Sequence, residues 1–147
     1  FAVDMKEAVR TMNSIKEQGI NLAIDDFGSG TSSFVALHQF PVDVLKVDRS
    51  LIKNIEHSTG EAALLHALVV MARNLGMGLV AEGIESASQM LAVQQLGCEY
   101  MQGFYYAKPM SHKDLTCFLR RESMVDVDIR RKSWLGDETR GSVFRNA

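Results

Sequence analysis

The pattern of apolar and polar residues divides most of the chain into short apolar runs and longer segments with a helical period. Between residues 5 and 20, apolar side chains recur at roughly helical spacing, and Gly19 follows as a helix-ending glycine would. Residues 21–28 form an apolar run that ends in two carboxylates and a glycine, which predicts a buried strand leading into a loop. This alternation of helix and strand then repeats. Further strands are expected at 42–48, 78–82 and 100–104, and further helices at 61–75, at 87–96 and from an N-cap at Ser111 through Leu119.

Strands that alternate with helices, and that are apolar on both faces, predict an α/β fold with a parallel sheet covered by helices. An open doubly wound sheet and a closed eight-stranded barrel both fit this order. Four strand–helix units make only half of such a barrel, whose usual length is about 250 residues. The chain also begins with a helix instead of a strand, as if it were cut from a longer protein.

The composition is that of one soluble domain with a hydrophobic core. Of the 147 residues, 46% are hydrophobic and 23% are charged, with a formal net charge of -2. No global positive field is available to bind a DNA or RNA polymer by counterion release. No apolar run reaches the roughly 18 to 20 residues that cross a bilayer, and no signal peptide is evident, so we expect a cytoplasmic location. Cys98 and Cys117 lack metal-ligand spacing and are expected to be buried thiols.

The last part of the chain has a different character. Residues 120–147 are rich in charge, show no sustained period and contain the sole tryptophan, Trp134. We therefore expect a folded portion at 1–119 and a charged C-terminal extension or linker at 120–147.

Each predicted strand places polar side chains at its carboxyl end. In a parallel α/β protein these ends lie along one edge, which is where functional sites are built. The convergence of several such groups is stronger evidence than any one residue. The residues are Asp25, Asp26, Lys46, Asp48, Glu82 and Gln102.

Two adjacent carboxylates repel each other, and a hard divalent cation such as Mg²⁺ or Mn²⁺ offsets this repulsion. Asp25 and Asp26 are therefore candidate metal ligands, although either could instead cap the loop that follows. Lys46 lies in an apolar strand and should face carboxylates or a phosphate, as a catalytic group or in a structural salt bridge. Glu82 could bind a metal, take a proton from water or be structural. Gln102 could contact a nucleobase edge or a loop.

Four motifs in order resemble the signature of EAL-type cyclic di-GMP phosphodiesterases, over about residues 1 to 119. They are Asp25-Asp26-Phe27-Gly28-Ser29-Gly30-Thr31-Ser32-Ser33, Leu45-Lys46-Val47-Asp48-Arg49-Ser50, Ala81-Glu82-Gly83-Ile84-Glu85, and Gly97-Cys98 with Gln102-Gly103-Phe104 and Lys108-Pro109. The resemblance implies the C-terminal half of a TIM-like (β/α)8 barrel. It also implies a two-metal hydrolase that uses Mg²⁺ or Mn²⁺ to convert cyclic di-GMP to linear pGpG.

The resemblance also implies a role for each matching residue. Asp25 would bridge two metal ions, Asp26 would bind the second, and Glu82 would be a metal-proximal acid and general base. Lys46 would hold the nucleophilic water or a phosphate oxygen. The remaining roles are guanine contact by Gln102, support of the substrate site by Asp48, and anchoring by Glu85 of the loop after the double aspartate.

The chain also departs from the family pattern. The Glu-Ala-Leu motif, an asparagine ligand and a further glutamate lie upstream of its first residue, so part of the first metal's ligand set is absent, and Thr31 replaces a usual aromatic residue. Activity of this chain alone is therefore uncertain, and we expect weak hydrolysis or none. The alternative function is a module that binds cyclic di-GMP or another protein without activity. A half-barrel would expose strand edges, which predicts a homodimer or pairing with a missing N-terminal half.

A response-regulator receiver is a further alternative, because it also uses an acidic pair, a phosphorylated aspartate and a Lys-Pro. Asp48 and Lys108-Pro109 would match that set, but Lys46, Glu82 and Gln102 would have no role.

Overall fold

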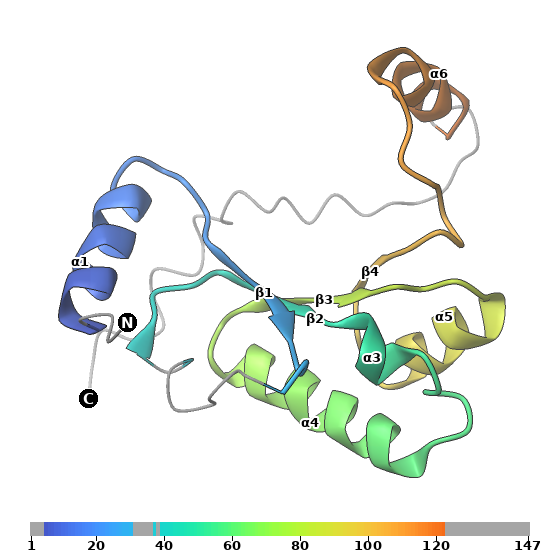
Figure 1. Cartoon of the computed structure of the whole chain (residues 1–147), viewed down its shortest axis with the longest axis horizontal. Coiled ribbons are helices and arrows are strands. Elements are labelled where there is room, and N and C mark those ends of the chain that lie inside the picture. The colour runs from blue at the N-terminus through green and yellow to red at the C-terminus, as the bar shows by residue number, and fades with distance from the viewer. Residues whose placement is uncertain (1–4, 31–36, 38, 123–147) are drawn as a thin grey trace. The chain divides into compact units, whose positions relative to one another are not determined.

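The computed structural model describes residues 5–30, 37 and 39–122 of the chain (Figure 1). These residues divide between two compact units, 1–108 and 109–147. The first unit contains four strands, β1 (Ala23–Phe27), β2 (Val44–Val47), β3 (Gly78–Glu82) and β4 (Tyr100–Gln102). Its described helices are α1 (Met5–Lys16), α3 (Arg49–Ile52), α4 (Thr59–Asn74) and α5 (Ala87–Gln95). The second unit contains α6 (His112–Glu122).

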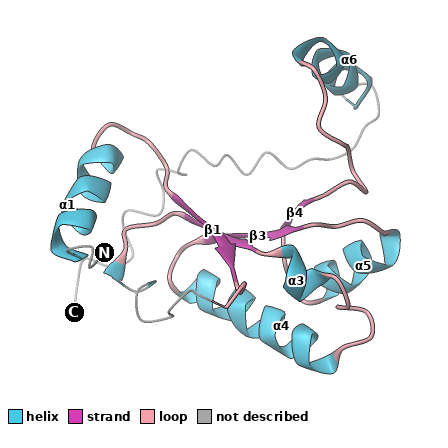
Figure 2. Ribbon diagram, in the orientation of Figure 1, coloured by secondary structure: helices cyan, strands magenta, loops and turns pink. Residues whose placement is uncertain are grey.

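The four strands form one parallel sheet in the order β1-β2-β3-β4. This confirms the prediction of an α/β fold with four parallel strands. Described helices lie between β2 and β3 and between β3 and β4 in the sequence, as parallel pairing of these strands requires. Figure 2 shows α4 and α5 together on one side of the sheet.

The hydrophobic core lies between this side of the sheet and the helices. Alternate strand residues face it, so Leu45 and Val47 of β2 and Leu79 and Ala81 of β3 are buried. They pack with a stripe of α4 residues at helical spacing and with Val93 of α5. The α4 stripe consists of Leu65, Leu68, Val69 and Ala72.

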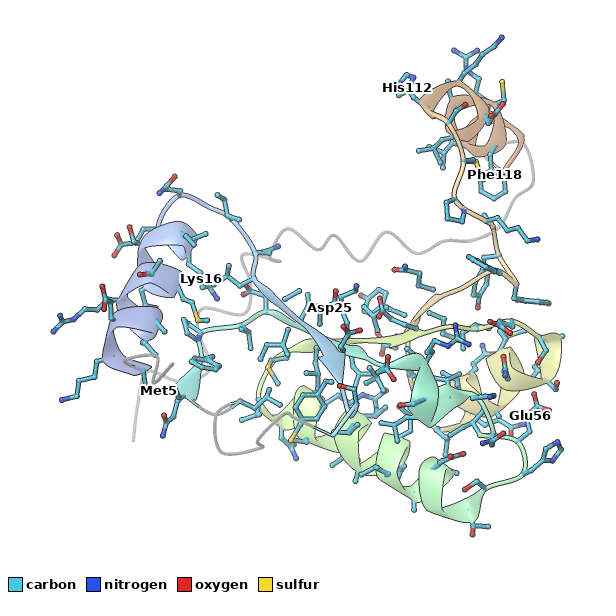
Figure 3. The ribbon with its side chains drawn as sticks, in the orientation of Figure 1. Met5, Lys16, Asp25, Glu56, His112 and Phe118 are labelled. Atoms are coloured by element: carbon cyan, nitrogen blue, oxygen red, sulfur yellow. The ribbon has the colours of Figure 1, made fainter. Side chains whose placement is uncertain are left out.

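The opposite face of the sheet differs from the expectation of strands that are apolar on both faces. Lys46 in β2 and Glu82 in β3 are only partly buried there, and Asp25 in β1 is exposed. Side chains alternate in direction along a strand, so the residues between the buried ones point to the opposite face. That face is polar and can hold a site. Asp25 projects from the sheet on the side away from α4 (Figure 3).

Two short features of the helices differ from the sequence prediction. Helix α3 directly follows β2 and was not predicted, because four residues are too few to show a helical period. Helix α6 continues to Glu122, so the expected boundary between 119 and 120 falls inside a helix. None of the residues 112–120 is buried, so the expectation of a buried Cys117 is wrong, whereas Cys98 is buried as expected. No described helix is long and apolar enough to cross a membrane.

Candidate active site

Three carboxylates converge at the carboxyl ends of β1 and β3. Asp25, Asp26 and Glu82 each offer one oxygen, and these oxygens all lie within 4.8 Å of one another. Asp25 and Asp26 are exposed and Glu82 is partly buried. The structure thus brings together the three residues that were predicted as metal ligands from the sequence.

A β-bulge places both aspartates against the same residue of the next strand. Ile24 pairs with Leu45 and Phe27 pairs with Val47, so Asp25 and Asp26 together oppose the single residue Lys46. An extra residue in one strand bends it and redirects its side chains. The bulge explains how two consecutive residues, which would normally face opposite sides of a sheet, both reach the site.

The backbone of Asp26 is in the left-handed region, with a φ of 53°. This conformation is unfavourable for residues other than glycine, although aspartate and asparagine tolerate it best. Ser29 supports the turn, because its backbone N–H and its hydroxyl both donate to the Asp26 carbonyl oxygen, the hydroxyl at 2.9 Å. Strain of this kind often accompanies functional sites.

Lys46 bridges the carboxylates of the neighbouring strands. Its Nζ lies 2.8 Å from Oδ1 of Asp25 and 2.5 Å from Oε1 of Glu82. The exposed fractions of the side chains are 26% for Lys46, 17% for Glu82 and 64% for Asp25, so the Glu82 bond is the better shielded from water. The sequence left open a structural salt bridge from Lys46 to Asp48 or to Asp25, and the structure shows the contact with Asp25.

The ion pairs shift two titrations. The hydrogen bond from Lys46 is the main cause that lowers the pKa of Asp25, and desolvation only partly opposes it. The hydrogen bonds to Asp25 and then to Glu82 raise the pKa of Lys46, again against desolvation. Both groups are therefore held in their charged forms at neutral pH.

The donor set suits a hard divalent cation. Three carboxylates face one ammonium group, which leaves an excess of negative charge at the cluster. Carboxylate oxygens are the ligands that Mg²⁺ and Mn²⁺ prefer, and a divalent ion would offset their mutual repulsion. The chemistry of the donors therefore fits the metal that the sequence predicted.

Gln102 lies at the edge of this cluster. It is exposed and pairs in register with Glu82 on the adjacent strand. Its side chain is thus available to a ligand that contacts the carboxyl ends of β3 and β4.

Asp48 has a local structural contact. Its carboxylate accepts a hydrogen bond from the Ser50 backbone N–H at 2.9 Å and forms the N-cap of α3. Hydrogen bonds from Ser50, first from the side chain and then from the backbone, lower the pKa of Asp48. Asp48 therefore orders the helix that follows Lys46.

Glu85 is exposed, and its backbone N–H donates to Oε1 of Gln89 at 2.8 Å. The loop that Glu85 was expected to anchor includes residues 31–33, which lie outside the described residues. Its anchoring role stays a prediction.

Sequence reasoning missed the contacts of Gln89. This residue and Ser86 form a capping box at the start of α5. The pattern Ser-x-x-Gln was a visible signal for it. The bond from Gln89 to the Lys53 carbonyl oxygen joins distant segments, and no sequence pattern indicates it.

The chain is similar to known proteins across most of the described residues. The EAL domain family matches residues 2–109. The cyclic di-GMP phosphodiesterase NbdA of Pseudomonas aeruginosa is 36% identical over 80% of this chain and 15% of its own length. This chain therefore spans less than a quarter of that relative.

Solved structures give the same result. The PaMucR phosphodiesterase in complex with c-di-GMP superposes with a TM-score of 0.70 at 34% identity, covering 78% of this chain and 46% of the other. A manganese/cy-diGMP complex of BlrP1 from Klebsiella pneumoniae superposes with a TM-score of 0.65 at 34% identity, covering 68% of this chain and 26% of the other. A calcium/cy-diGMP complex of BlrP1 is also similar, with a TM-score of 0.66.

Proposed function

Because this chain belongs to the EAL domain family, a family of TIM-like barrels, we propose that it supplies part of the site for hydrolysis of cyclic di-GMP to linear pGpG. The observation that carries the proposal is the convergence of Asp25, Asp26 and Glu82 around Lys46. These four residues lie in the segments that resemble the family motifs, and similar structures are complexes with c-di-GMP.

We propose Mg²⁺ or Mn²⁺ as the cofactor of the site. Asp25 would bridge two ions, Asp26 would bind the second, and Glu82 would lie beside them. The manganese and calcium complexes of BlrP1 support a divalent cation at such a site. Bound divalent ions lower the pKa of a bound water molecule and neutralise charge on a phosphodiester.

Lys46 and Glu82 are the proposed catalytic residues. The Lys46 ammonium group carries three donors, and it would orient the nucleophilic water or hold a phosphate oxygen. Its raised pKa, caused by hydrogen bonds to Asp25 and Glu82, keeps these donors protonated at neutral pH. The Glu82 carboxylate would accept a proton from water as a general base.

Three further residues have proposed supporting roles. Gln102 would contact a guanine edge through its amide, which can both donate and accept. Asp48 would support the substrate site from the N-cap of α3. Glu85 would anchor the loop that follows the double aspartate.

The experiment is a hydrolysis assay of the full-length protein with cyclic di-GMP and Mg²⁺ or Mn²⁺, with separation of linear pGpG by chromatography. We expect turnover that chelation abolishes and that Glu82→Gln lowers by roughly 10²-fold or more. Tight binding of cyclic di-GMP without turnover would instead support the binding module considered as the alternative. Neither binding nor turnover would overturn the proposal.

The other expectations from the sequence remain proposals. They are a cytoplasmic location, a homodimer or pairing with an N-terminal half, and a folded portion at 1–119 followed by an extension at 120–147. Weak or absent hydrolysis by the 147-residue chain alone also remains a prediction. The same assay on this chain tests it directly.

A further inference from the structure

The loop after Glu82, residues 83–86, is held on one side by β4 and the turn that follows it. The Ile84 backbone N–H donates to the Gln102 carbonyl oxygen at 3.1 Å, and the Tyr105 backbone N–H donates to the Ile84 carbonyl oxygen at 2.9 Å. Gly103 lies so close that a Cβ atom there would overlap the Ile84 backbone. The Ile84 side chain is fully buried. This side of the loop is therefore fixed.

The other side of the loop is held by Gln89. Its Oε1 accepts from the backbone N–H groups of Glu85 at 2.8 Å and Ser86 at 3.2 Å. Its Nε2 donates to the carbonyl oxygen of Lys53, the C-cap of α3, at 3.3 Å. One amide side chain therefore joins the loop after β3 to the end of the helix after β2.

A second hydrogen bond also joins the loop 83–86 to the segment after α3. The Ser86 hydroxyl donates to Oε1 of Glu56 at 3.1 Å, and Glu56 lies beside α5 (Figure 3). At the start of α3, Gly83 packs so tightly against Arg49 that a Cβ atom on Gly83 would overlap the arginine side chain. The segment 49–56 thus contacts the loop directly at two places, Arg49 and Glu56, and through Gln89 at a third, Lys53.

These contacts matter because Gly83 directly follows Glu82. Gly83 has a φ of 76°, and glycine moves between backbone conformations at little energetic cost. The direction of the Glu82 side chain is set on one side by the pairing of Glu82 with Gln102 in the sheet and on the other by what holds the loop beyond Gly83. Lys46 lies two residues before Asp48, the N-cap of α3. The short helix α3 is therefore connected to both members of the Lys46–Glu82 ion pair, to Lys46 through the chain and to Glu82 through the loop.

We propose that Gln89 is a positioning residue, which fixes Glu82 against Lys46 by tying the loop 83–86 to the carbonyl oxygen of Lys53. The role in catalysis rests on the function proposed above. Gln89 itself would touch neither substrate nor metal. It would set the geometry of the carboxylate that does.

The test compares Gln89→Glu with the wild-type full-length protein. A glutamate keeps the acceptor for Glu85 and Ser86 and suits a helix N-terminus, but it cannot donate to Lys53. We expect an unchanged unfolding temperature. The Kd for Mn²⁺ should rise by roughly 3- to 10-fold, which approaches the loss of metal affinity typical when a residue that orients a metal ligand is replaced. We expect kcat to fall by a similar factor, with KM changed by less than about twofold, because Gln102 is untouched.

Gln94→Ala is the matched control, because Gln94 is an exposed glutamine on the same helix. It should leave the Kd for Mn²⁺, kcat and KM at wild-type values. Gln89→Ala removes the cap as well as the bond to Lys53, so it should combine the loss of Mn²⁺ affinity with a lower unfolding temperature. A wild-type Kd for Mn²⁺ in Gln89→Glu would overturn the proposal.

Hydrogen–deuterium exchange without metal gives a readout that is independent of hydrolysis. Faster exchange of the amides in residues 82–86 in Gln89→Glu than in Gln94→Ala supports the proposal, and equal exchange overturns it. If the wild-type protein binds Mn²⁺ but does not hydrolyse cyclic di-GMP, the proposed function fails. The exchange and the Kd for Mn²⁺ still decide whether Gln89 positions the loop.

Discussion

Lys46 on β2 reaches Glu82 on the adjacent strand β3, and its Nζ lies 2.5 Å from the carboxylate oxygen Oε1. The same ammonium group lies 2.8 Å from Asp25, so it is the one described cation that these two carboxylates share. Without a metal, the ammonium group offsets the repulsion among the three clustered carboxylates. Lys46 therefore has a structural and a chemical role that substitution can separate.

For Lys46→Met, we expect hydrolysis of cyclic di-GMP to fall by roughly 10²-fold or more, because the donors for water or phosphate are lost. Mn²⁺ should still bind, because a protonated lysine is not a ligand. The metal-free variant should unfold at a lower temperature than wild type, and Mn²⁺ should raise that temperature more than it does for wild type. Thermal unfolding with and without MnCl₂ measures both effects. Loss of Mn²⁺ binding would contradict this separation of roles.

The Asp25–Lys46 ion pair should make stability insensitive to pH near neutrality. Its hydrogen bond lowers the folded-state pKa of Asp25, so the contribution of the Asp25 carboxylate is lost only as the pH falls through that value. The raised pKa of Lys46 has the opposite sign, and its contribution is lost only as the pH rises through that value. Both groups stay charged between about pH 5 and pH 9.

We therefore expect a constant difference in unfolding free energy between wild type and Lys46→Met from about pH 5 to pH 9. The difference should shrink below about pH 4, as the pH falls from the ordinary aspartate pKa through the lowered folded-state pKa of Asp25. Urea unfolding at a series of pH values measures it, with Lys113→Met as the control for an exposed lysine. A difference that changes steeply near pH 7 would show that another group controls the pair.

Substitutions of Asp26 can separate its effect on stability from its effect on metal binding. Its φ of 53° favours glycine, so Asp26→Gly should unfold at an equal or higher temperature than wild type without metal. Asp26→Ala keeps the strain and should lose about 1 kcal/mol. Both variants should bind Mn²⁺ more weakly by roughly tenfold or more, since a carboxylate ligand is lost. Calorimetric titration with MnCl₂ measures the affinity, and unchanged binding would remove Asp26 from the proposed ligands.

Asp48 can be assigned either to substrate contact or to capping alone. Asparagine caps helices as well as aspartate does, whereas alanine costs about 1 kcal/mol. If Asp48 supports the substrate through its charge, Asp48→Asn should raise KM for cyclic di-GMP at unchanged stability. If Asp48 only caps α3, Asp48→Asn should match wild type, and Asp48→Ala should lose stability. Paired kinetics and urea unfolding distinguish the two.

The sequence predicted those features that depend on residues close together in the chain. The strand at Gly78–Glu82 was found because an apolar run begins at glycine and ends at a carboxylate. The grouping of Asp25, Asp26 and Glu82 followed from the rule that parallel strands share a carboxyl edge. The bulge that turns both aspartates toward Lys46 depends on strand register, which single-strand patterns do not contain. The same holds for the bond between Gln89 and Lys53, since it joins residues 36 positions apart.

Gly103 gives the sharpest test of how the loop after Glu82 is packed. A Cβ atom there would overlap the carbonyl and amide groups of Ile84, which are backbone atoms and cannot rotate away. Gly103→Ala should therefore lose about 2 to 3 kcal/mol, a typical cost of inserting atoms into a packed region, and should weaken Mn²⁺ binding as residues 83–86 shift. Gly60→Ala is the opposite control. Gly60 lies in α4 with its nearest neighbour, Ser58 Oγ, 3.9 Å from the added Cβ, so alanine there should add up to about 1 kcal/mol. Urea unfolding measures the expected loss of stability in Gly103→Ala and the expected gain in Gly60→Ala. An unchanged unfolding free energy in Gly103→Ala would show that the loop can move away from β4.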